Sequence, residues 1–443
     1  MRLSGLSGWG RYPRQDCRLL RPADLDAVAG LPAATPLIAR GNGRAYGDAA
    51  LGVPDTLAMR AFNRMLSFDP GRGVLVAQAG VLLAEVIDVF LPRGWFPAVT
   101  PGTKFVTLGG AIAADVHGKN HHGEGSFSTC VEWVEVLGPD GVVHRASRTQ
   151  NPDLFGWTCG GMGLTGVILR AAIRLRAVET GWIRQRTWPA PGLKSAMEIF
   201  EATQDATYSV AWIDCLAQGR ALGRSLVMTG EHAGRAELGE RERADPFVAR
   251  RRRAKTVPFD FPQIALNPLS VRAFNQLYYG LGAWNRGEAL IDYDSYFYPL
   301  DALLEWNRIY GRRGFAQFQC VIPLGASAEG MAALLTTIAR AGQGSFLAVL
   351  KRMGAQESRF SFPMEGYTLA LDFPVKAGTA RLFTELERIV IDHGGRFYLA
   401  KDAFLSAGTL RAADPRTAAF TAMRGASGSA GRFVSALSER LEL

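Results

Sequence analysis

The pattern of apolar and polar positions changes partway along the chain. In residues 1–178, short apolar runs alternate with helix-like runs, and glycines separate them. Apolar positions in residues 81–90 follow helical spacing, and Pro92 and Gly94 mark the end of the predicted helix. Two strand-like runs flank residues 138–141, Gly-Pro-Asp-Gly, and predict a β-hairpin. This part of the chain is therefore expected to be a mixed α+β unit.

Longer runs with more aromatic residues follow. Those at residues 208–214, 314–323, 344–354 and 366–375 have the β-branched, aromatic and alternating content of strands. With the helix-like runs between them, they predict a second domain built on an antiparallel sheet. Alternation groups Gln317 with Gln319, Val349 with Lys351 and Met353, and Thr368 with Ala370 and Asp372, each set on one face. Polar side chains on a shared face indicate a lined pocket, or else a sheet face turned to solvent.

Length and composition indicate a folded globular protein. The chain has 443 residues, of which 48% are hydrophobic and 21% charged, so two or three domains are expected. No apolar run reaches the roughly 18 to 20 residues that span a bilayer, and the first residues lack the apolar middle of a secretory signal. We expect a cytoplasmic protein. The five cysteines are odd in number and share no close spacing, which favours reduced thiols over a disulfide or zinc framework.

The formal charge of +9 includes one dense run, the four arginines at residues 250–253 with Lys255. A solvated surface loop is the first interpretation of this run. The second is docking onto anionic lipid head groups, which would make the protein peripheral at the inner membrane. No nucleic-acid partner is expected, because the run has neither interleaved aromatic residues nor a recognisable binding module.

Glycine-rich clusters at residues 39–50, 100–126 and 158–171 each adjoin an apolar run. Glycine lets the backbone approach an anion closely, and successive N–H groups can form a nest for phosphate oxygens. The first cluster has neither the Gly-Lys-Ser/Thr of a Walker loop nor the Gly-x-Gly-x-x-Gly spacing of a Rossmann turn. Three such clusters in one domain indicate a long, extended ligand that carries a pyrophosphate.

Further motifs extend this pattern in order over nearly the whole chain: RGNGRAYGDAAL, TLGGAIAADVHGKNHH, GGMGLTGVI, GFAQFQCVIP, SFLAVLKRMG, DFPVK, GGRFYLAKD and the terminal RLEL. Together they resemble the vanillyl-alcohol oxidase superfamily of flavoenzymes, with its PCMH-type FAD-binding domain. Within that superfamily the chain most closely resembles the decaprenylphosphoryl-β-D-ribose oxidase family. The resemblance implies a two-domain α+β flavoprotein with an FAD-binding domain (1–178), a substrate-binding domain with an antiparallel sheet (179–395), and a C-terminal segment (396–443) that returns to the first domain.

The same resemblance implies a function. The expected reaction is FAD-dependent oxidation of the 2-hydroxyl of a polyprenylphosphoryl-β-D-ribose to the 2-keto intermediate, the first half of epimerisation to an arabinose donor for cell-wall arabinan. The implied partners are this lipid-linked sugar phosphate and an NAD(P)H-dependent short-chain reductase that completes the epimerisation. The alternative is a soluble FAD-dependent sugar or alditol oxidase that uses oxygen.

The cofactor is expected to be held without a covalent bond. Arg44 stands where covalent members of the superfamily have the histidine that attaches FAD. The residues that the resemblance assigns to FAD binding are Arg40, Gly41, Asn42, Gly43, Arg44, Ala45, Tyr46, Thr103, Gly109, Gly110, Ala113, His117, Gly118, Asn120, Gly163, Gly166, Val167 and Lys401.

Lys401 and His117 are the candidate catalytic residues. The resemblance puts Lys401 beside the flavin, where an ammonium could stabilise negative charge on the reduced ring or orient the sugar hydroxyl. His117 titrates near working pH and is a candidate base or polar clamp. The base stays open between His117, Lys401 and a water. No metal is expected, because His117, His121 and His122 lack the His-Glu-x-x-His pattern.

The substrate-binding candidates come from the sheet and from one glycine cluster. Lys119 is the predicted partner of the lipid phosphate, and Trp212, although a core residue by default, matches a position that lines the family's pocket. Ala370 stands where the family's best-known members have a cysteine. The complete predicted set is Lys119, Trp212, Gln317, Gln319, Val349, Lys351 and Ala370.

Overall fold

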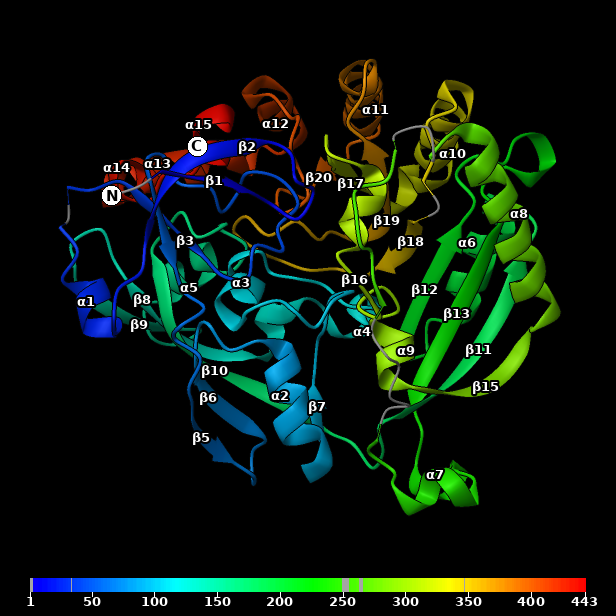
Figure 1. Ribbon diagram of the computed structural model, residues 1–443, viewed down its shortest axis with the longest axis horizontal. Helices are drawn as coiled ribbons and strands as arrows, with labels where there is room; N and C mark the ends of the chain where they lie inside the picture. The colour runs from blue at the N-terminus through cyan, green and yellow to red at the C-terminus, as the bar shows by residue number, and fades with distance from the viewer. Residues whose placement is uncertain (1–2, 33, 249–254, 263–265, 346) are drawn as a thin grey trace.

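The computed structural model describes residues 3–32, 34–248, 255–262, 266–345 and 347–443. In this part of the chain the protein is α+β, as the sequence predicts, with helices packed on sheets of four, six and eight strands (Figure 1). None of the described helices combines the length and the apolar content that a membrane crossing requires. The arginine run at residues 250–253 lies outside the described residues, and Lys255 is exposed at a short strand beside them.

The first 177 residues supply the two smaller sheets. The four-stranded sheet has the order β1-β2-β4-β3, from β1 (Leu3–Ser7), β2 (Arg14–Leu20), β3 (Leu37–Arg40) and β4 (Asp55–Ala58). The six-stranded sheet has the order β5-β6-β10-β8-β9 with β7 on β10, from β5 (Met65–Asp69), β6 (Val74–Gln78), β7 (Trp95–Pro97), β8 (Val131–Leu137), β9 (Val143–Ser147) and β10 (Val167–Ala177). Their helices are α1 (Leu25–Ala29), α2 (Leu83–Phe90), α3 (Leu108–Ala113), α4 (His121–Glu124) and α5 (Pro152–Thr158).

Two predictions for this part are confirmed. The hairpin is β8 and β9, whose turn passes through Gly141 with φ of +79°, a value that favours glycine. The helix expected in residues 81–90 is α2, and the Glu85 carboxylate accepts a hydrogen bond from the Leu82 N–H at its start. It runs into a 3₁₀ turn, which ends at Gly94 with φ of +81°.

The eight-stranded sheet forms the second half of the molecule. Its order is β15-β11-β13-β12-β18-β19-β17-β20, from β11 (Trp182–Ala190), β12 (Tyr208–Ile213), β13 (Ser225–His232), β15 (Gly287–Asp292), β17 (Phe315–Pro323), β18 (Ala348–Met353), β19 (Gly366–Pro374) and β20 (Arg396–Phe397). A separate pair joins β14 (Lys255–Thr256) to β16 (Leu303–Leu304). The predicted strands β12, β17, β18 and β19 are confirmed and are neighbours in an antiparallel arrangement.

The helices of this half are α6 (Leu193–Ala202), α7 (Glu240–Ala244), α8 (Pro268–Trp284), α9 (Tyr293–Phe297), α10 (Leu324–Ala341) and α11 (Thr379–Asp392). Core packing explains how the sheet faces are used. Leu350 of β18 is buried with Leu334 of α10 and Leu386 of α11 in one hydrophobic cluster. Val349 and Lys351 alternate with Leu350 and therefore point away from these helices, toward the first half of the molecule.

The last part of the chain, red in Figure 1, returns to the first half of the molecule. The last helices are α12 (Ala407–Ala413), α13 (Arg416–Ser427), α14 (Ser429–Arg432) and α15 (Ala436–Leu441). The Val434 N–H donates to the Leu37 carbonyl over 3.0 Å, and the Ala436 N–H donates to the Leu51 carbonyl over 2.8 Å. The end of the chain therefore packs on the four-stranded sheet. The division at residues 178/179 and 395/396 stays a prediction.

Candidate active site

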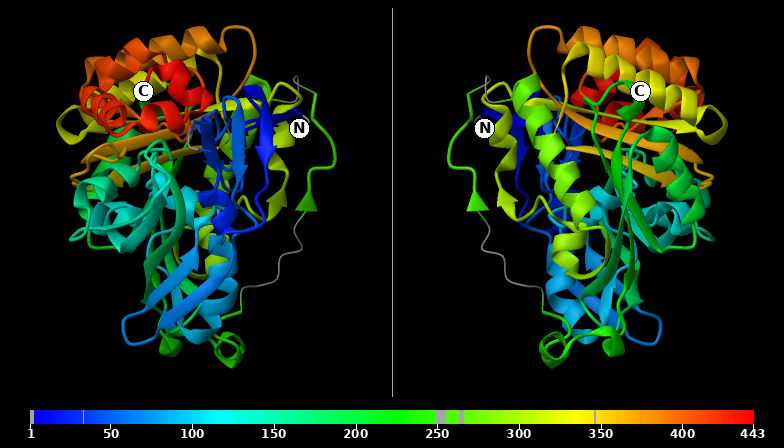
Figure 2. Two further views of the ribbon diagram at one scale, coloured as in Figure 1. Left: turned by 90° about the vertical axis from the view of Figure 1, so that its left-hand side faces the viewer. Right: turned by 90° about the vertical axis from the view of Figure 1, so that its right-hand side faces the viewer.

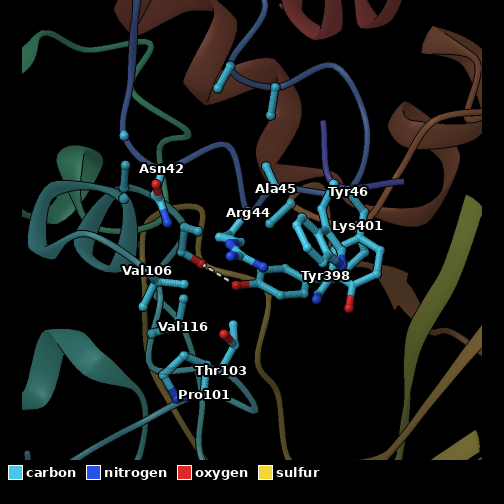
Figure 3. A pocket seen from close by; sticks show the side chains of 18 of the residues that line it. Asn42, Arg44, Ala45, Tyr46, Pro101, Thr103, Val106, Val116, Tyr398 and Lys401 are labelled. Carbon is cyan, nitrogen blue, oxygen red and sulfur yellow. Dashed lines mark hydrogen bonds between the residues drawn. The ribbon is translucent and has the colours of Figure 1, made fainter. Parts of the chain in front are cut away.

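One cavity lies between the glycine-rich loops and the eight-stranded sheet (Figure 3). The predicted site residues that line it are Gly41, Asn42, Gly43, Arg44, Ala45, Tyr46, Thr103, Gly109, Gly110, Ala113, His117, Gly163, Gly166, Gln317, Gln319, Val349, Lys351, Ala370 and Lys401. The lining also contains Thr368 and Asp372 but lacks Met353. The polar face of the sheet is thus turned into a pocket, which decides between the two interpretations of its alternation.

The glycine loops form a tightly built wall of this cavity. A Cβ at Gly41 would lie 2.2 Å from the Thr107 hydroxyl oxygen, and one at Gly109 would lie 2.9 Å from Ala79 Cβ. Gly43 and Gly163 have φ of +64° and +78°, where glycine is favoured. These positions leave backbone exposed to whatever occupies the cavity, as a cradle for a phosphate-bearing ligand requires.

Arg44 faces the cavity from the first loop. Its guanidinium carbon lies 3.9 Å from the centre of the Trp9 ring and 5.2 Å from that of Phe105. Burial lowers the pKa of Arg44, and the nearby Asp301 and Glu305 oppose that shift. Within the described residues the Arg44 Nε has no hydrogen-bond partner. A cation held between rings with an unused donor is suited to an anionic or carbonyl acceptor of a ligand.

Lys401 approaches the cavity from the opposite end of the chain. Its Nζ lies 3.6 Å from the centre of the Tyr46 ring. The Tyr46 N–H donates to the Ala400 carbonyl over 2.9 Å, so the two loops are joined through their backbones. Burial lowers the pKa of Lys401 and raises that of Asp372, and the attraction between the two opposes both shifts.

His117 is buried at the junction of the two halves. Its Nε2 lies 3.0 Å from Gln319 Nε2, which also donates to Thr368 Oγ1 over 3.2 Å. With Gln319 as the donor, His117 Nε2 accepts and the ring proton lies on Nδ1. Within the described residues Nδ1 has no partner. Burial holds the pKa of His117 well below its usual range, and the lysines Lys351 and Lys401 lower it further, so the ring is neutral.

The sheet contributes a row of polar groups opposite the loops. Gln317 Nε2 donates to Asp372 Oδ1 over 2.5 Å, and both belong to neighbouring strands. Burial lowers the pKa of Lys351 to about 8. The row gives this wall of the cavity hydrogen-bonding side chains and the positive charge of Lys351.

Some predicted residues lie outside the cavity lining. Lys119 donates to the Tyr296 carbonyl and lies over the Tyr296 ring, with 3.9 Å between Nζ and the ring centre. Trp212 packs on Tyr278 of α8 with 4.7 Å between ring centres. The other predicted residues outside the lining are Arg40, Gly118, Asn120 and Val167.

Sequence reasoning missed other residues of the lining. Tyr398 lies beside His117, with ring centres 5.2 Å apart, and its hydroxyl donates to the Ala114 carbonyl. It belongs to the YLAKD motif, which was the available signal. Trp9 and Asp301 also line the cavity, but no local pattern marks them because they come from segments distant in sequence.

The residues that line the cavity fit FAD. Arg44 Nε and His117 Nδ1 are unused polar atoms on residues that line the cavity, and the glycine wall has no room for side chains. The described histidines do not form a metal site with acidic or thiol groups. His121 Nε2 is bonded to Gln356 and His122 Nε2 to the Ala206 carbonyl, so the ring nitrogens are directed to separate protein partners.

Comparison with known proteins agrees with this geometry. Residues 23–147 match the family model described as an FAD binding domain. Residues of this domain border the cavity, and the protein is an FAD-dependent oxidoreductase.

The chain is 36% identical, over 449 residues, to the decaprenylphosphoryl-β-D-ribose oxidase of Mycolicibacterium smegmatis, with 99% of this chain and 97% of that protein covered. It is 33% identical to an uncharacterized protein of Streptomyces coelicolor, with 82% of this chain and 100% of that protein covered. Cytokinin dehydrogenase 5 of Arabidopsis thaliana is 27% identical over 46% of this chain and 39% of its own length. The chain belongs to the decaprenylphosphoryl-β-D-ribose oxidase family.

Proposed function

We propose that this chain oxidises the 2-hydroxyl of a polyprenylphosphoryl-β-D-ribose to the 2-keto sugar, with FAD held non-covalently. The observation that carries the proposal is the shared cavity, in which the glycine loops face the sheet residues Gln317, Gln319 and Lys351, with Lys401 between them. The name of the Mycolicibacterium relative supports a ribose that carries a lipid phosphate. The product would pass to an NAD(P)H-dependent short-chain reductase, and the protein would work at an anionic membrane surface.

Different side chains of the protein have different roles in the proposed reaction. FAD, when bound, supplies the acceptor for the hydride. Lys401 is the group that takes the hydroxyl proton, because burial lowers its pKa and brings the neutral amine within reach of working pH. His117 is neutral and donates from Nδ1, so its role is to orient a ligand acceptor rather than to serve as the base.

The sheet residues are proposed to hold the sugar. Gln317 and Gln319 are fixed by Asp372 and Thr368, so their amides are oriented before any substrate arrives. Lys351 supplies positive charge toward the phosphate. Lys119 and Trp212 lie beyond the cavity wall and would meet only a longer substrate.

An absorption spectrum tests this function. The purified protein is expected to show an oxidised flavin band that bleaches anaerobically on addition of a prenylphosphoryl ribose. Bleaching by free alditols, with none by the prenyl substrate, would instead indicate the soluble sugar or alditol oxidase.

The non-covalent attachment has its own test. The first loop contains Arg44 and no histidine or cysteine that could form a bond to the flavin ring. Acid precipitation is therefore expected to leave the yellow chromophore in the supernatant as intact FAD. A coloured pellet whose mass exceeds that of the chain by one FAD would contradict this expectation.

A further inference from the structure

Helix α8 carries most of its large apolar residues on the face away from the protein. The positions packed against the fold are Val271, Asn275, Tyr278 and Gly282, of which Tyr278 packs on Trp212. The outer face presents the large apolar residues, with Trp284 87% and Leu269 76% exposed. The exposed apolar residues of the outer face are Leu269, Phe274, Leu277, Leu281 and Trp284. An ordinary amphipathic surface helix has the opposite arrangement.

The inner contacts fix this orientation. Asn275 Nδ2 donates to Asp214 Oδ1 over 2.7 Å, and both side chains are buried. A Cβ at Gly282 would lie 2.1 Å from Leu226 Cδ1, so a larger residue there would have to displace the Leu226 side chain. A rotation that buried Leu277 or Leu281 would break the buried hydrogen bond. This outward apolar face is defined here as the α8 face, and the inner contacts hold its orientation. The helix itself lies at the surface of the molecule (Figure 2).

The charged residues within helix α8 and in the three residues after it have one sign. Arg272 is the charged residue within the helix, and Arg286 follows directly after its end. Residues 268–287 contain no aspartate or glutamate. Tryptophan and tyrosine prefer the boundary between the head groups and the acyl chains of a bilayer. This composition suits an anionic lipid surface, where apolar burial and attraction of arginines to phosphate act together.

The α8 face is also continuous with the cavity. Tyr278 packs on Trp212 with 4.7 Å between ring centres. Trp212 pairs in register with Val349 of the next strand, and Val349 lines the cavity. Packed apolar side chains thus connect the cavity wall to helix α8. A prenyl chain that lay along these side chains would keep its distal end near the membrane.

We infer that the α8 face docks this enzyme on an anionic phospholipid bilayer, with the helix lying in the plane of the interface. The docking itself depends on the helix alone. Its use in drawing a prenyl chain from the bilayer into the cavity rests on the function proposed above.

Vesicle sedimentation of the full FAD-loaded chain tests the docking without any substrate. Vesicles of phosphatidylcholine with phosphatidylglycerol are compared with vesicles of phosphatidylcholine alone. The double variant Leu277→Glu/Trp284→Glu is expected to lower the partition coefficient on the anionic vesicles by about tenfold or more, since it puts two charges at the inserted face. The matched control is Leu66→Glu, which changes a 47% exposed leucine on the distant strand β5 and is expected to sediment like the wild type.

A second measurement does not rely on a variant. Hydrogen exchange of the wild type is expected to slow in residues 268–284 when anionic vesicles are added, with β5 unchanged. The inference is overturned if the double variant sediments like the wild type, if exchange in α8 does not change, or if the wild type forms a dimer through this helix in place of binding vesicles. Vesicle binding without bleaching by prenylphosphoryl ribose would leave the docking intact and reject the proposed substrate.

Discussion

At the scale of single residues, the site is defined by buried lysines that influence one another. Lys351 lowers the pKa of both Lys119 and Lys401 through charge repulsion, in addition to the larger effect of burial. The buried carboxylate of Asp372 opposes this lowering of the pKa at Lys401. The lysines consequently give the region a positive potential that an anionic ligand would relieve.

Lys401 carries the sharpest prediction for activity. Lys401→Met is expected to lower the rate constant of anaerobic flavin bleaching by about 10²- to 10⁴-fold, because the proposed proton acceptor is lost. In the wild type the rate is expected to rise with pH across the neutral range and then level off, since only the neutral amine accepts a proton and burial lowers its pKa. Stopped-flow absorbance checks both, and the oxidised flavin spectrum of the variant establishes that the cofactor is retained. A variant with the wild-type rate and pH profile would assign the base elsewhere.

Lys119 gives a prediction for stability. Burial lowers its pKa from 10.5 to about 7, so between these values the unfolded chain binds a proton that the folded chain does not. Its contribution therefore makes the protein more stable as pH rises through this window. Lys119→Met removes the effect, and the gain in unfolding free energy of the wild type relative to the variant between neutral and alkaline pH is expected to be about 2 kcal/mol.

Denaturant unfolding at several pH values measures this difference. Lys194→Met is the control, because that side chain is 92% exposed in its ion pair. A difference between wild type and Lys119→Met that does not change with pH would mean that Lys119 keeps its proton when folded.

At this scale, the sequence predicts a residue of the cavity only where a contiguous motif contains it. Lys401 and Tyr46 belong to contiguous motifs and both line the cavity. Trp9 and Asp301 line it as well, but their approach to Arg44 depends on tertiary packing between distant segments. Lys119 is close in sequence to His117, yet its ammonium turns to Tyr296, because α9 offers a buried carbonyl and a ring face.

At the scale of elements, the terminal helix α15 holds two of the loops that border the cavity. Arg440 forms ion pairs with Asp48 over 2.8 Å and with Asp402 over 2.9 Å. Asp48 belongs to the first glycine loop, and Asp402 follows Lys401. Both carboxylates are buried, so one guanidinium from the last helix holds the two cavity loops together.

Arg440→Met tests this support. Two buried carboxylates would lose their cation, and the unfolding free energy is expected to fall by about 3–5 kcal/mol. FAD affinity is expected to fall as well, because Asp48 anchors the loop that carries Arg44 and Tyr46. Chemical denaturation and fluorescence titration with FAD measure the two effects.

Arg411→Met is the comparison for Arg440→Met. Its ion pair with Glu442 is more than half exposed on both sides, so a change below about 1 kcal/mol is expected. Equal losses in the two variants would mean that Arg440 has no special supporting role.

Elements with strong patterns were predictable and the others were not. Alternation and β-branched content identified β12, β17, β18 and β19, which form the central part of the sheet. The outer strand β15 alternates weakly, with Glu288 and Ala289 both exposed, and only its pairing with β11 defines it as a strand. The outward apolar face of α8 was likewise not predictable, because a helix that packs on a sheet ordinarily buries its apolar side chains.

At the scale of the whole molecule, Asp115 joins the two halves. Its buried carboxylate accepts from Ser126 Oγ over 2.5 Å and from the Ser128 N–H over 2.7 Å within its own half. From the other half it accepts from Ser361 Oγ over 2.5 Å and from Gln356 Nε2 over 3.0 Å. Because Asp115 lies two residues before His117, this junction also positions the ring between the glycine wall and the sheet.

Asp115→Asn is expected to weaken the junction. An amide cannot accept from all four donors, and the unfolding free energy should fall by about 2–4 kcal/mol as buried donors lose their acceptor. A red or blue shift of the flavin band would accompany it if the halves reorient. Asp153→Asn is the control, because its ion pair with Arg359 also joins the halves but is 76% exposed at Asp153. Thermal unfolding with the visible spectrum tests both, and equal losses would reject a special role for Asp115.

The contact between the first loop and the Lys401 turn restricts how this enzyme can be recombined. A Cβ at Gly47 would lie 1.8 Å from the Asp402 carbonyl oxygen, so the two backbones fit only as a matched pair. A chimera that exchanged residues 179–395 with those of a relative would keep this pair from one parent. A single crossover anywhere between Gly47 and Asp402 would instead combine a first loop from one parent with a Lys401 turn from the other. Libraries made by exchanging the central segment are therefore the design that leaves flavin binding intact while substrate preference varies.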